Sequence, residues 1–235
     1  NNSIHLNMKK SLLLLLLISL FTWSCKKEEK THPYTFYYWR TNFELNQTEK
    51  QALEKAMLLF WEHGYEATSI SDLTQALELT APSLYSSFGD KAGLFYKCID
   101  YYLAHEACPI VPIFLEAKTA KVAFELYLYD NVKRLAQPNK PAGCMLVVAT
   151  MSCSDNAQAV QHNILEKRLQ TKQKLFERLE QGVANGDLPA TAPLQEMTDF
   201  YATVVQGLTI QARDGATVEQ LHKVVEHAMR AWELF

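Results

Sequence analysis

The chain lacks an excess of basic residues. Its 235 residues include 23 Lys and Arg against 26 Asp and Glu, which gives a formal net charge of −3 and a pI near 6.2. Bulk charge therefore gives no support to nucleic-acid binding, and such a function must rest on a local motif.

Paired cysteines are also missing. The five cysteines form no C-x-x-C pair and their number is odd, which excludes a regular disulfide scaffold. For residues 50 onward this usage favours a reducing cytosol. The five are Cys25, Cys98, Cys108, Cys144 and Cys153.

Common catalytic signatures are absent from the sequence. It contains no glycine-rich phosphate loop, no nucleophile elbow and no cluster with metal-ligand spacing. His222 and His227 are five residues apart and do not share a helix face well. We expect no enzymatic activity, no cofactor and no metal site.

The longest apolar run, at residues 12–21, is too short for a membrane span, which needs about 20 residues. Lys9 and Lys10 precede it, and Cys25 follows with a charged stretch behind it. This order resembles a bacterial lipoprotein signal, so Cys25 is a candidate for lipidation.

Two interpretations of residues 1–46 remain open. The favoured one is a fused or mis-assembled reading frame that joins a lipoprotein-like segment to an unrelated protein between Phe43 and Gln51. The other is a genuine membrane anchor. We expect this segment to be poorly ordered, because its aromatic-rich stretch at residues 31–43 shows no helical period.

Residues 47–97 predict three short helices and the start of a fourth. Leu53, Ala56, Met57 and Phe60 form one apolar stripe of a helix at 47–63, which Gly64 can end. Ser69 with Asp72 makes a capping box for a second helix. Thr80 caps a third at about 81–88, with Pro82 in its first turn. The last two are joined by a short turn, the layout of a helix-turn-helix.

Residues 98–235 predict further helices broken at prolines and glycines, and no strand pattern appears. The fold class is therefore all-α, with an N-terminal three-helix domain and a larger C-terminal helical domain. The body helices are expected near 91–106, 119–136, 142–152, 157–184, 191–212 and 217–234.

Specific runs of residues resemble bacterial regulators of the TetR/AcrR type. The first is Ala52-Leu53-x-x-Ala56-x-x-Leu59-Phe60-x-x-x-Gly64-Tyr65-x-x-Thr68-Ser69-Ile70, and the second is Leu84-Tyr85-x-x-Phe88-Gly89-x-Lys91. Further matches are Gly143-Cys144-Met145-Leu146, Ala184-x-Gly186-Asp187-Leu188 and Gln206-Gly207-Leu208-x-x-Gln211-Ala212-Arg213-Asp214-Gly215. The resemblance covers about residues 51–235.

The resemblance implies a ligand-responsive repressor that binds a palindromic operator in double-stranded DNA as a homodimer. The helix at 81–88 would enter the major groove. The implied DNA-binding residues are Thr68, Ser69, Thr80, Ala81, Ser83, Tyr85, Ser86 and Lys91. Thr68, Ser69 and Thr80 could serve as helix caps as well as facing DNA.

The sequence departs from the family pattern in its turn residue and in its charge. Glu78 stands at the turn position where the family usually has glycine. Residues 47–97 carry more acids than bases, and a basic arm before the first helix is missing. DNA affinity is therefore expected to be weak.

The body would supply the dimer interface and the effector pocket. Two apolar stripes near the C-terminus predict a four-helix bundle between two copies: Met197, Phe200, Val204 and Leu208, then Val218, Leu221, Val225 and Trp232. Candidates for a pocket that binds an unknown small-molecule effector are Tyr101, Phe114, Phe124, Tyr127, Cys144 and Met145, although each also fits an ordinary core.

The competing function is a membrane-anchored lipoprotein of unknown role, held through Cys25. A fused reading frame with impaired DNA binding is a further alternative. The regulator interpretation predicts a cytoplasmic protein, and a membrane partner follows only from a genuine N-terminal signal.

Overall fold

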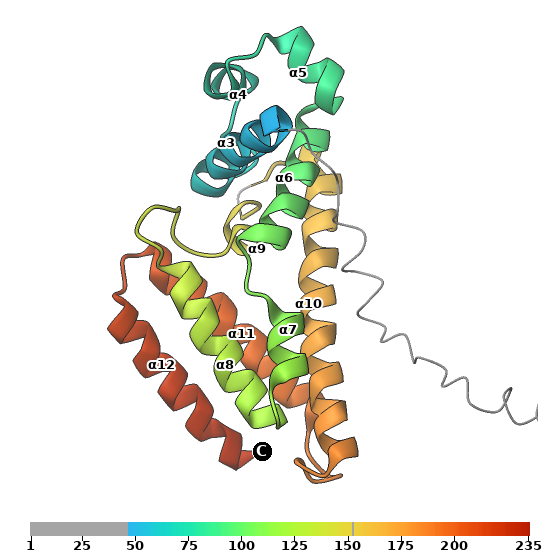
Figure 1. Cartoon of the computed structure of the whole chain (residues 1–235), viewed down its shortest axis with the longest axis vertical. Helices are drawn as coiled ribbons and strands as arrows, with labels where there is room; N and C mark the ends of the chain where they lie inside the picture. The colour runs from blue at the N-terminus through green and yellow to red at the C-terminus, as the bar shows by residue number, and fades with distance from the viewer. Residues whose placement is uncertain (1–46, 152) are drawn as a thin grey trace, which may run out of the picture. The chain divides into compact units, whose positions relative to one another are not determined.

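A computed structural model describes residues 47–151 and 153–235, and within these ranges regular structure is entirely helical (Figure 1). The predicted lipoprotein-like signal and Cys25 lie outside the described residues. The α-helices are α3 (Gln47–His63), α4 (Ile70–Leu77), α5 (Ala81–Phe88), α6 (Lys91–His105), α7 (Ile110–Glu116), α8 (Ala120–Leu135), α9 (Met145–Val148), α10 (Gln158–Asn185), α11 (Leu194–Arg213) and α12 (Val218–Arg230).

The caps predicted for α4 and α5 are present. The Ser69 hydroxyl accepts a hydrogen bond from the Asp72 amide, while the Asp72 carboxylate accepts one from the Ser69 amide. Thr80 caps α5 by accepting from the Ser83 amide, and Pro82 lies in the first turn. These bonds satisfy N–H groups that have no partner within the helix, so both helices begin at defined residues.

Glu78 takes the left-handed backbone conformation that ends α4, with φ of 58°. An L-residue with a Cβ pays about 1 kcal/mol or more for this conformation, which glycine adopts freely. The Glu78 carboxylate lies 3.1 Å from Lys55 Nζ of α3, but both side chains are at least half exposed, so this ion pair stabilises little. The turn between α4 and α5 is therefore mildly strained.

One core cluster joins α3 to α6 and continues into α9 and the start of α10. Phe60 meets Phe95 edge-on with ring centroids 5.1 Å apart, and Trp61 meets Tyr102 at 4.9 Å. Leu73 and Leu84 bring α4 and α5 onto the same cluster, which extends to Ile164. The boundary expected at residues 97 and 98 falls inside α6, and the structure shows no break in packing there.

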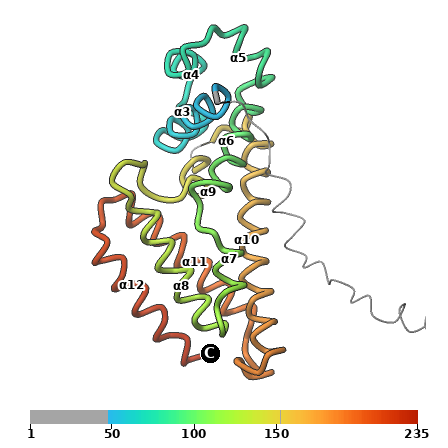
Figure 2. Tube along the Cα trace, viewed as in Figure 1, coloured from blue at the N-terminus to red at the C-terminus, as the bar shows by residue number. Residues whose placement is uncertain are grey.

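A second cluster is formed by side chains of α7, α8, α10, α11 and α12. Figure 2 traces the course of these helices. Phe124 contacts both Tyr201 and Trp232, and the Tyr201 hydroxyl donates to the Ala228 carbonyl at 3.1 Å. The apolar stripe of α12 is used here, because this helix packs against α8 and α11 of its own chain.

The body differs from the sequence prediction in two places. Residues 110–116 form α7, where prolines predicted a break; Pro112 lies in its first turn, where a proline is tolerated. The helix expected at 142–152 is reduced to α9. Among the described helices, none combines the length and apolar content that a membrane span requires.

The strain at Glu78 can be measured with two variants that both lack the ion pair. At a left-handed position Glu78→Gly is expected to be more stable than Glu78→Ala by about 1 kcal/mol, the reverse of their order inside a helix. Urea unfolding of the two variants checks this order. An alanine variant at least as stable as the glycine variant would contradict it.

Candidate nucleic-acid interface

The outward face of α5 consists of short or polar side chains. Ser83, Ser86 and Ser87 are exposed, and Tyr85 is 45% exposed, so this tyrosine is not part of the core. Leu84 is fully buried and fixes the helix from behind. Such a face lets a helix backbone approach a groove closely and offers hydroxyls to bases or phosphates.

Thr80 and Ala81 lie at the leading end of α5, as the sequence predicts. Thr80 is exposed, and its hydroxyl lies 3.0 Å from that of Ser83 while it also caps the helix. Ala81 is half-buried. This end of the helix therefore presents one hydroxyl pair in a fixed position.

Ser69 and Thr68, next to each other in sequence, differ in their access to solvent. Ser69 is exposed at the start of α4, where the helix dipole favours an anion, but the Asp72 carboxylate already occupies its hydroxyl. Thr68 is 1% exposed, and its hydroxyl donates to the Gly64 carbonyl at 2.7 Å. The Thr68 side chain thus closes the α3–α4 loop and does not face a phosphate as the sequence predicted.

Lys91 begins α6 and is held against the α3–α4 loop. Its ammonium donates to the Glu66 carbonyl at 3.3 Å and lies 4.6 Å from the centre of the Tyr65 ring. Partial burial lowers its pKa from the usual lysine value. These contacts fix the direction of a positive charge close to the loop that precedes α4.

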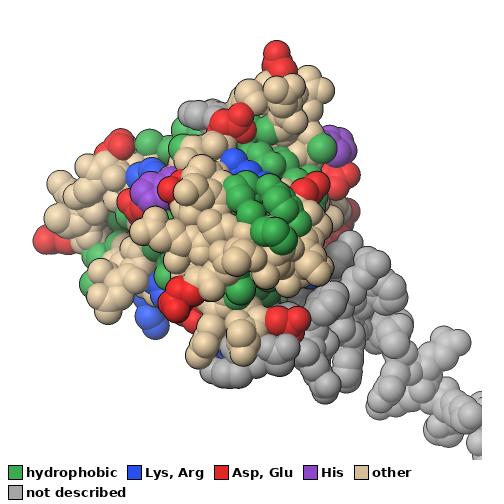
Figure 3. Space-filling view, turned by 90° about the horizontal axis from the view of Figure 1, so that it is seen from above, with side chains coloured by type: hydrophobic (Ala, Val, Ile, Leu, Met, Phe, Trp, Pro, Cys, Tyr) green, Lys and Arg blue, Asp and Glu red, His purple; other side chains and the backbone are tan. Residues whose placement is uncertain are grey.

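Charged side chains are sparse and of mixed sign on the surface formed by α4 and α5. Figure 3 looks onto α4 and α5 and shows scattered acidic and basic side chains among uncharged ones. α5 itself carries no charged residue. Two of the four lysines of residues 47–97 have aromatic neighbours, since Lys97 lies 5.1 Å from the Phe88 ring centre as Lys91 lies over Tyr65. The acidic balance predicted from the sequence is therefore not offset by a basic patch on α5.

The six predicted effector-pocket residues divide between the two cores. Phe114, Phe124 and Tyr127 lie together, with the Phe114 ring 5.6 Å from Phe124 and 5.7 Å from Tyr127. Tyr101 and Met145 belong to the other cluster. Cys144 packs against both clusters, and burial raises the pKa of its thiol, which disfavours a reactive thiolate.

A cleft of about 480 Å³ lies elsewhere, on the outer side of α3 and α4. None of the predicted effector residues lines it; its walls are Leu59, His63, Ala67, Asp72, Gln75 and Ala76. Within residues 47–151 and 153–235, no group of three His, Cys, Asp or Glu side chains is placed to hold a metal ion.

Most of the predicted dimer residues are buried inside their own chain. Phe200 and Val204 are half-buried, and Val218 is exposed. The remaining five have exposed fractions between 0% and 8%: Met197, Leu208, Leu221, Val225 and Trp232. These five side chains hold α11 and α12 in the fold, so they do not offer surface to a partner.

Other apolar side chains are exposed on α10. Leu165 is 43% exposed and Leu169 is 53% exposed, one turn apart on the same face. The i, i+4 spacing of these leucines was visible in the sequence, but exposure could only be read from the structure.

The sequence is similar to those of known proteins. A family model described as bacterial regulatory proteins, tetR family, matches residues 52–98. The HTH-type transcriptional repressor ComR of Escherichia coli strain K12 is 32% identical over 186 residues, 77% of this chain and 87% of ComR. The repressor BdcR of the same strain is 31% identical over 172 residues, covering 73% and 82%.

A solved structure extends the likeness to three dimensions. The TetR family transcriptional regulator CifR, a cysteine mutant complexed with 26-base-pair double-strand operator DNA, superposes with a TM-score of 0.77. It is 35% identical, and the match covers 80% of this chain and 98% of that one.

Lys91 can be tested as a phosphate contact by the salt dependence of binding to duplex DNA. Lys91→Gln removes the charge and keeps a donor for the Glu66 carbonyl, so it is expected to weaken binding to all sequences and to lower the salt slope by about 1. Lys223→Ala, on α12, is the control and should leave the slope unchanged. Equal slopes for Lys91→Gln and the unmodified protein would remove Lys91 from the interface.

Proposed function

The chain belongs to the TetR family of bacterial regulatory proteins, and on that premise we propose that it is a transcriptional repressor that reads operator DNA through α5. It is a DNA-binding regulator and not an enzyme. The observation that carries the proposal is the α4–α5 pair, in which both helices are capped at their starts and Leu73 and Leu84 are fully buried.

Hydroxyl groups supply the sequence reading in this proposal. Thr80, Ser83, Tyr85 and Ser86 lie along the exposed side of α5, where side chains that enter the major groove meet base edges. Lys91 flanks this helix and would contact a phosphate, whereas the Ser69 hydroxyl is already bonded to Asp72 and could offer one only by leaving that bond. We call the helices α3, α4 and α5 with the start of α6 the head. A head with few cations makes few phosphate contacts. Binding by this head would therefore depend more on base contacts and less on salt concentration than binding by a basic head.

A palindromic operator requires two copies of the head, and the exposed faces of α10 and α11 fit a homodimer. The two helices are consecutive and packed together, and the Lys172 ammonium of α10 pairs with Asp199 of α11. On α10, Leu169 lies one turn before Lys172, and on α11, Thr203 lies one turn after Asp199. Further along α11, Gly207 faces open space, because a Cβ there would meet nothing within 4 Å.

The α10–α11 face replaces the α11–α12 seam expected from the sequence. Leu165 and Leu169 are exposed on α10, and Gly207 on α11 allows close approach of a second helix, whereas the half-buried Phe200 contacts Phe235 beyond α12. On α12, Val218 and Val224 are exposed, and so are the charged Glu219, Lys223 and Arg230. Two copies joined by α10 and α11 would form a four-helix bundle.

The proposed ligand response rests on the sequence resemblance, and the aromatic group in the body is buried and would have to open to admit a ligand. Phe114, Phe124 and Tyr127 offer stacked and edge-on rings, which suit an apolar or aromatic small molecule. The Tyr127 hydroxyl lies among Cys108, Cys144 and Asn131, and burial raises the pKa of this tyrosine, so it stays protonated. Since this regulator acts on chromosomal DNA, the cytoplasm is its proposed location.

Selection from a random pool of duplex DNA tests the proposed function. We expect an inverted repeat with half-sites about one helical turn apart. Ser86→Asp places a negative charge on the exposed face of α5 and should abolish this binding, while Val122→Asp, on α8 and 40% exposed, is the matched control. Failure to enrich any sequence, or equal binding by Ser86→Asp, would refute the proposal.

The dimer face is tested by charge substitutions at three leucines of different exposure. Leu169→Glu should give a folded monomer, because the side chain is exposed in one chain and the charge would be buried between two. Light scattering gives the mass, and circular dichroism the helix content.

Two comparisons separate the dimer face from the fold. Leu126→Glu, on α8 and 48% exposed, should remain dimeric. Leu221→Glu, 1% exposed, should unfold the chain instead of dividing a dimer. A dimeric Leu169→Glu protein would place the interface elsewhere.

A further inference from the structure

The C-terminal end of α3 receives an arginine from the far end of the chain. The last carbonyls of a helix have no partner within it. Arg213, at the end of α11, donates from Nη2 to the Glu62 carbonyl at 2.7 Å and from Nη1 to the Trp61 carbonyl at 3.4 Å. A cation here also interacts favourably with the helix dipole.

A second connection to α3 comes from residues on either side of α9. The Trp61 indole N–H donates to the Gly143 carbonyl at 2.9 Å, and Trp61 itself is 1% exposed. The amide of Tyr65, just after α3, donates to the Ala149 carbonyl at 2.8 Å. Gly143 has φ of +86°, and a Cβ there would lie 3.1 Å from Thr209 of α11. The loop before α9 is thus held between α3 and α11.

These contacts give a structural role to residues of two sequence motifs. One begins with Gly143, and the other runs from Gln206 to Arg213. Both meet α3 at its last turn. α11 belongs to the proposed dimer face. α3 packs against α4 and α6, and α5 packs against the same two helices.

We infer that Arg213 is a positioning residue that fixes the DNA-reading head relative to the dimer helices, and so sets the separation of the two α5 helices. This inference rests on the proposed function. Reading two half-sites demands a defined distance between two recognition helices. A head whose α3 is bonded directly to α11 has less freedom to vary that distance than one held only by packing on α6, α9 and α10.

The head should remain folded without this bond. The packing of α3 on α6 stays in place, because it depends on Phe60, Trp61 and Phe95 and not on Arg213. The Arg213 side chain is exposed, so its removal opens no cavity. Loss of Arg213 should therefore affect position more than stability.

The test uses the operator obtained by selection and copies of it whose half-sites are moved apart or together by one or two base pairs. Arg213→Ala should remain a dimer of unchanged helix content, bind the selected operator about tenfold more weakly and discriminate less between spacings. Arg213→Lys keeps the charge but loses the bidentate guanidinium donor. Its operator affinity and spacing discrimination should lie between those of Arg213→Ala and the unmodified protein.

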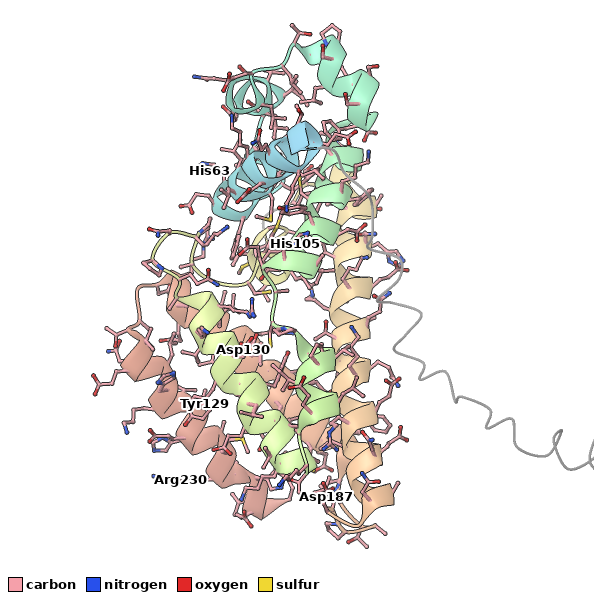
Figure 4. All side chains as sticks on the ribbon, in the orientation of Figure 1. His63, His105, Tyr129, Asp130, Asp187 and Arg230 are labelled. Atoms are coloured by element: carbon pink, nitrogen blue, oxygen red, sulfur yellow. The ribbon has the colours of Figure 1, made fainter. Side chains whose placement is uncertain are left out.

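Arg230→Ala is the matched control. Arg230 is also an exposed arginine in the last turn of a C-terminal helix, and Figure 4 shows it at the end of α12 away from α3. Its removal should leave affinity and spacing preference unchanged. Trp61→Phe, which deletes the indole donor to Gly143 and keeps the ring, should weaken the spacing preference as Arg213→Ala does.

The outcomes distinguish the inference from the proposed function. If the unmodified protein selects an operator and Arg213→Ala keeps its affinity and spacing preference, the inference fails and the proposed function stands. If the unmodified protein selects no operator, the proposed function fails. If Arg213→Ala does not fold, Arg213→Lys decides, and a wild-type spacing profile for it overturns a role for the guanidinium.

Discussion

The packing of α3 against α6 is the contact on which the rest of the structure depends. Phe60 and Trp61 of α3 meet Phe95 and Tyr102 of α6, all of them buried. α4 packs on α3, and α5 packs on α6 and α4, so both depend on this layer for their position. The same cluster extends into α9 and α10, so a disturbance in the body reaches the head through continuous packing and not through a flexible linker.

The head combines a firm scaffold with a sparse and mixed surface charge. Its aromatic core is dense, yet α5 bears no charge and Lys91 is engaged with Tyr65 and Glu66. Phosphate attraction supplies most non-specific binding, so a head of this kind spends less time on unrelated DNA. Under the proposed function, occupancy of an operator depends on the geometry of hydroxyl contacts, which requires the two heads to be held accurately.

The sequence predicted the head more accurately than the body. Caps such as Ser69 and Thr80 act within four residues, and buried positions such as Leu84 follow from the helical period, so α4 and α5 were confirmed along with the all-α fold. Periodicity shows that one face of α12 is buried but not what covers it; Leu221 and Val225 are covered by the chain's own α8 and α11. Thr68 shows the same limit, since a threonine before a helix fits a phosphate contact and an internal hydrogen bond equally well. The bond from Arg213 to α3 joins residues about 150 positions apart, and no local pattern contains it.

The exposed serines of α5 have a consequence for how this regulator could change over evolutionary time. Ser86 and Ser87 are both exposed, and the fixed side of the helix depends on Leu84. Longer side chains can replace these serines without repacking the interior, so new base preferences can arise by single substitutions while the scaffold keeps its stability. Duplicate genes of such a protein can diverge to different targets through one helical surface, and a library randomised at these positions offers the same route to the protein engineer.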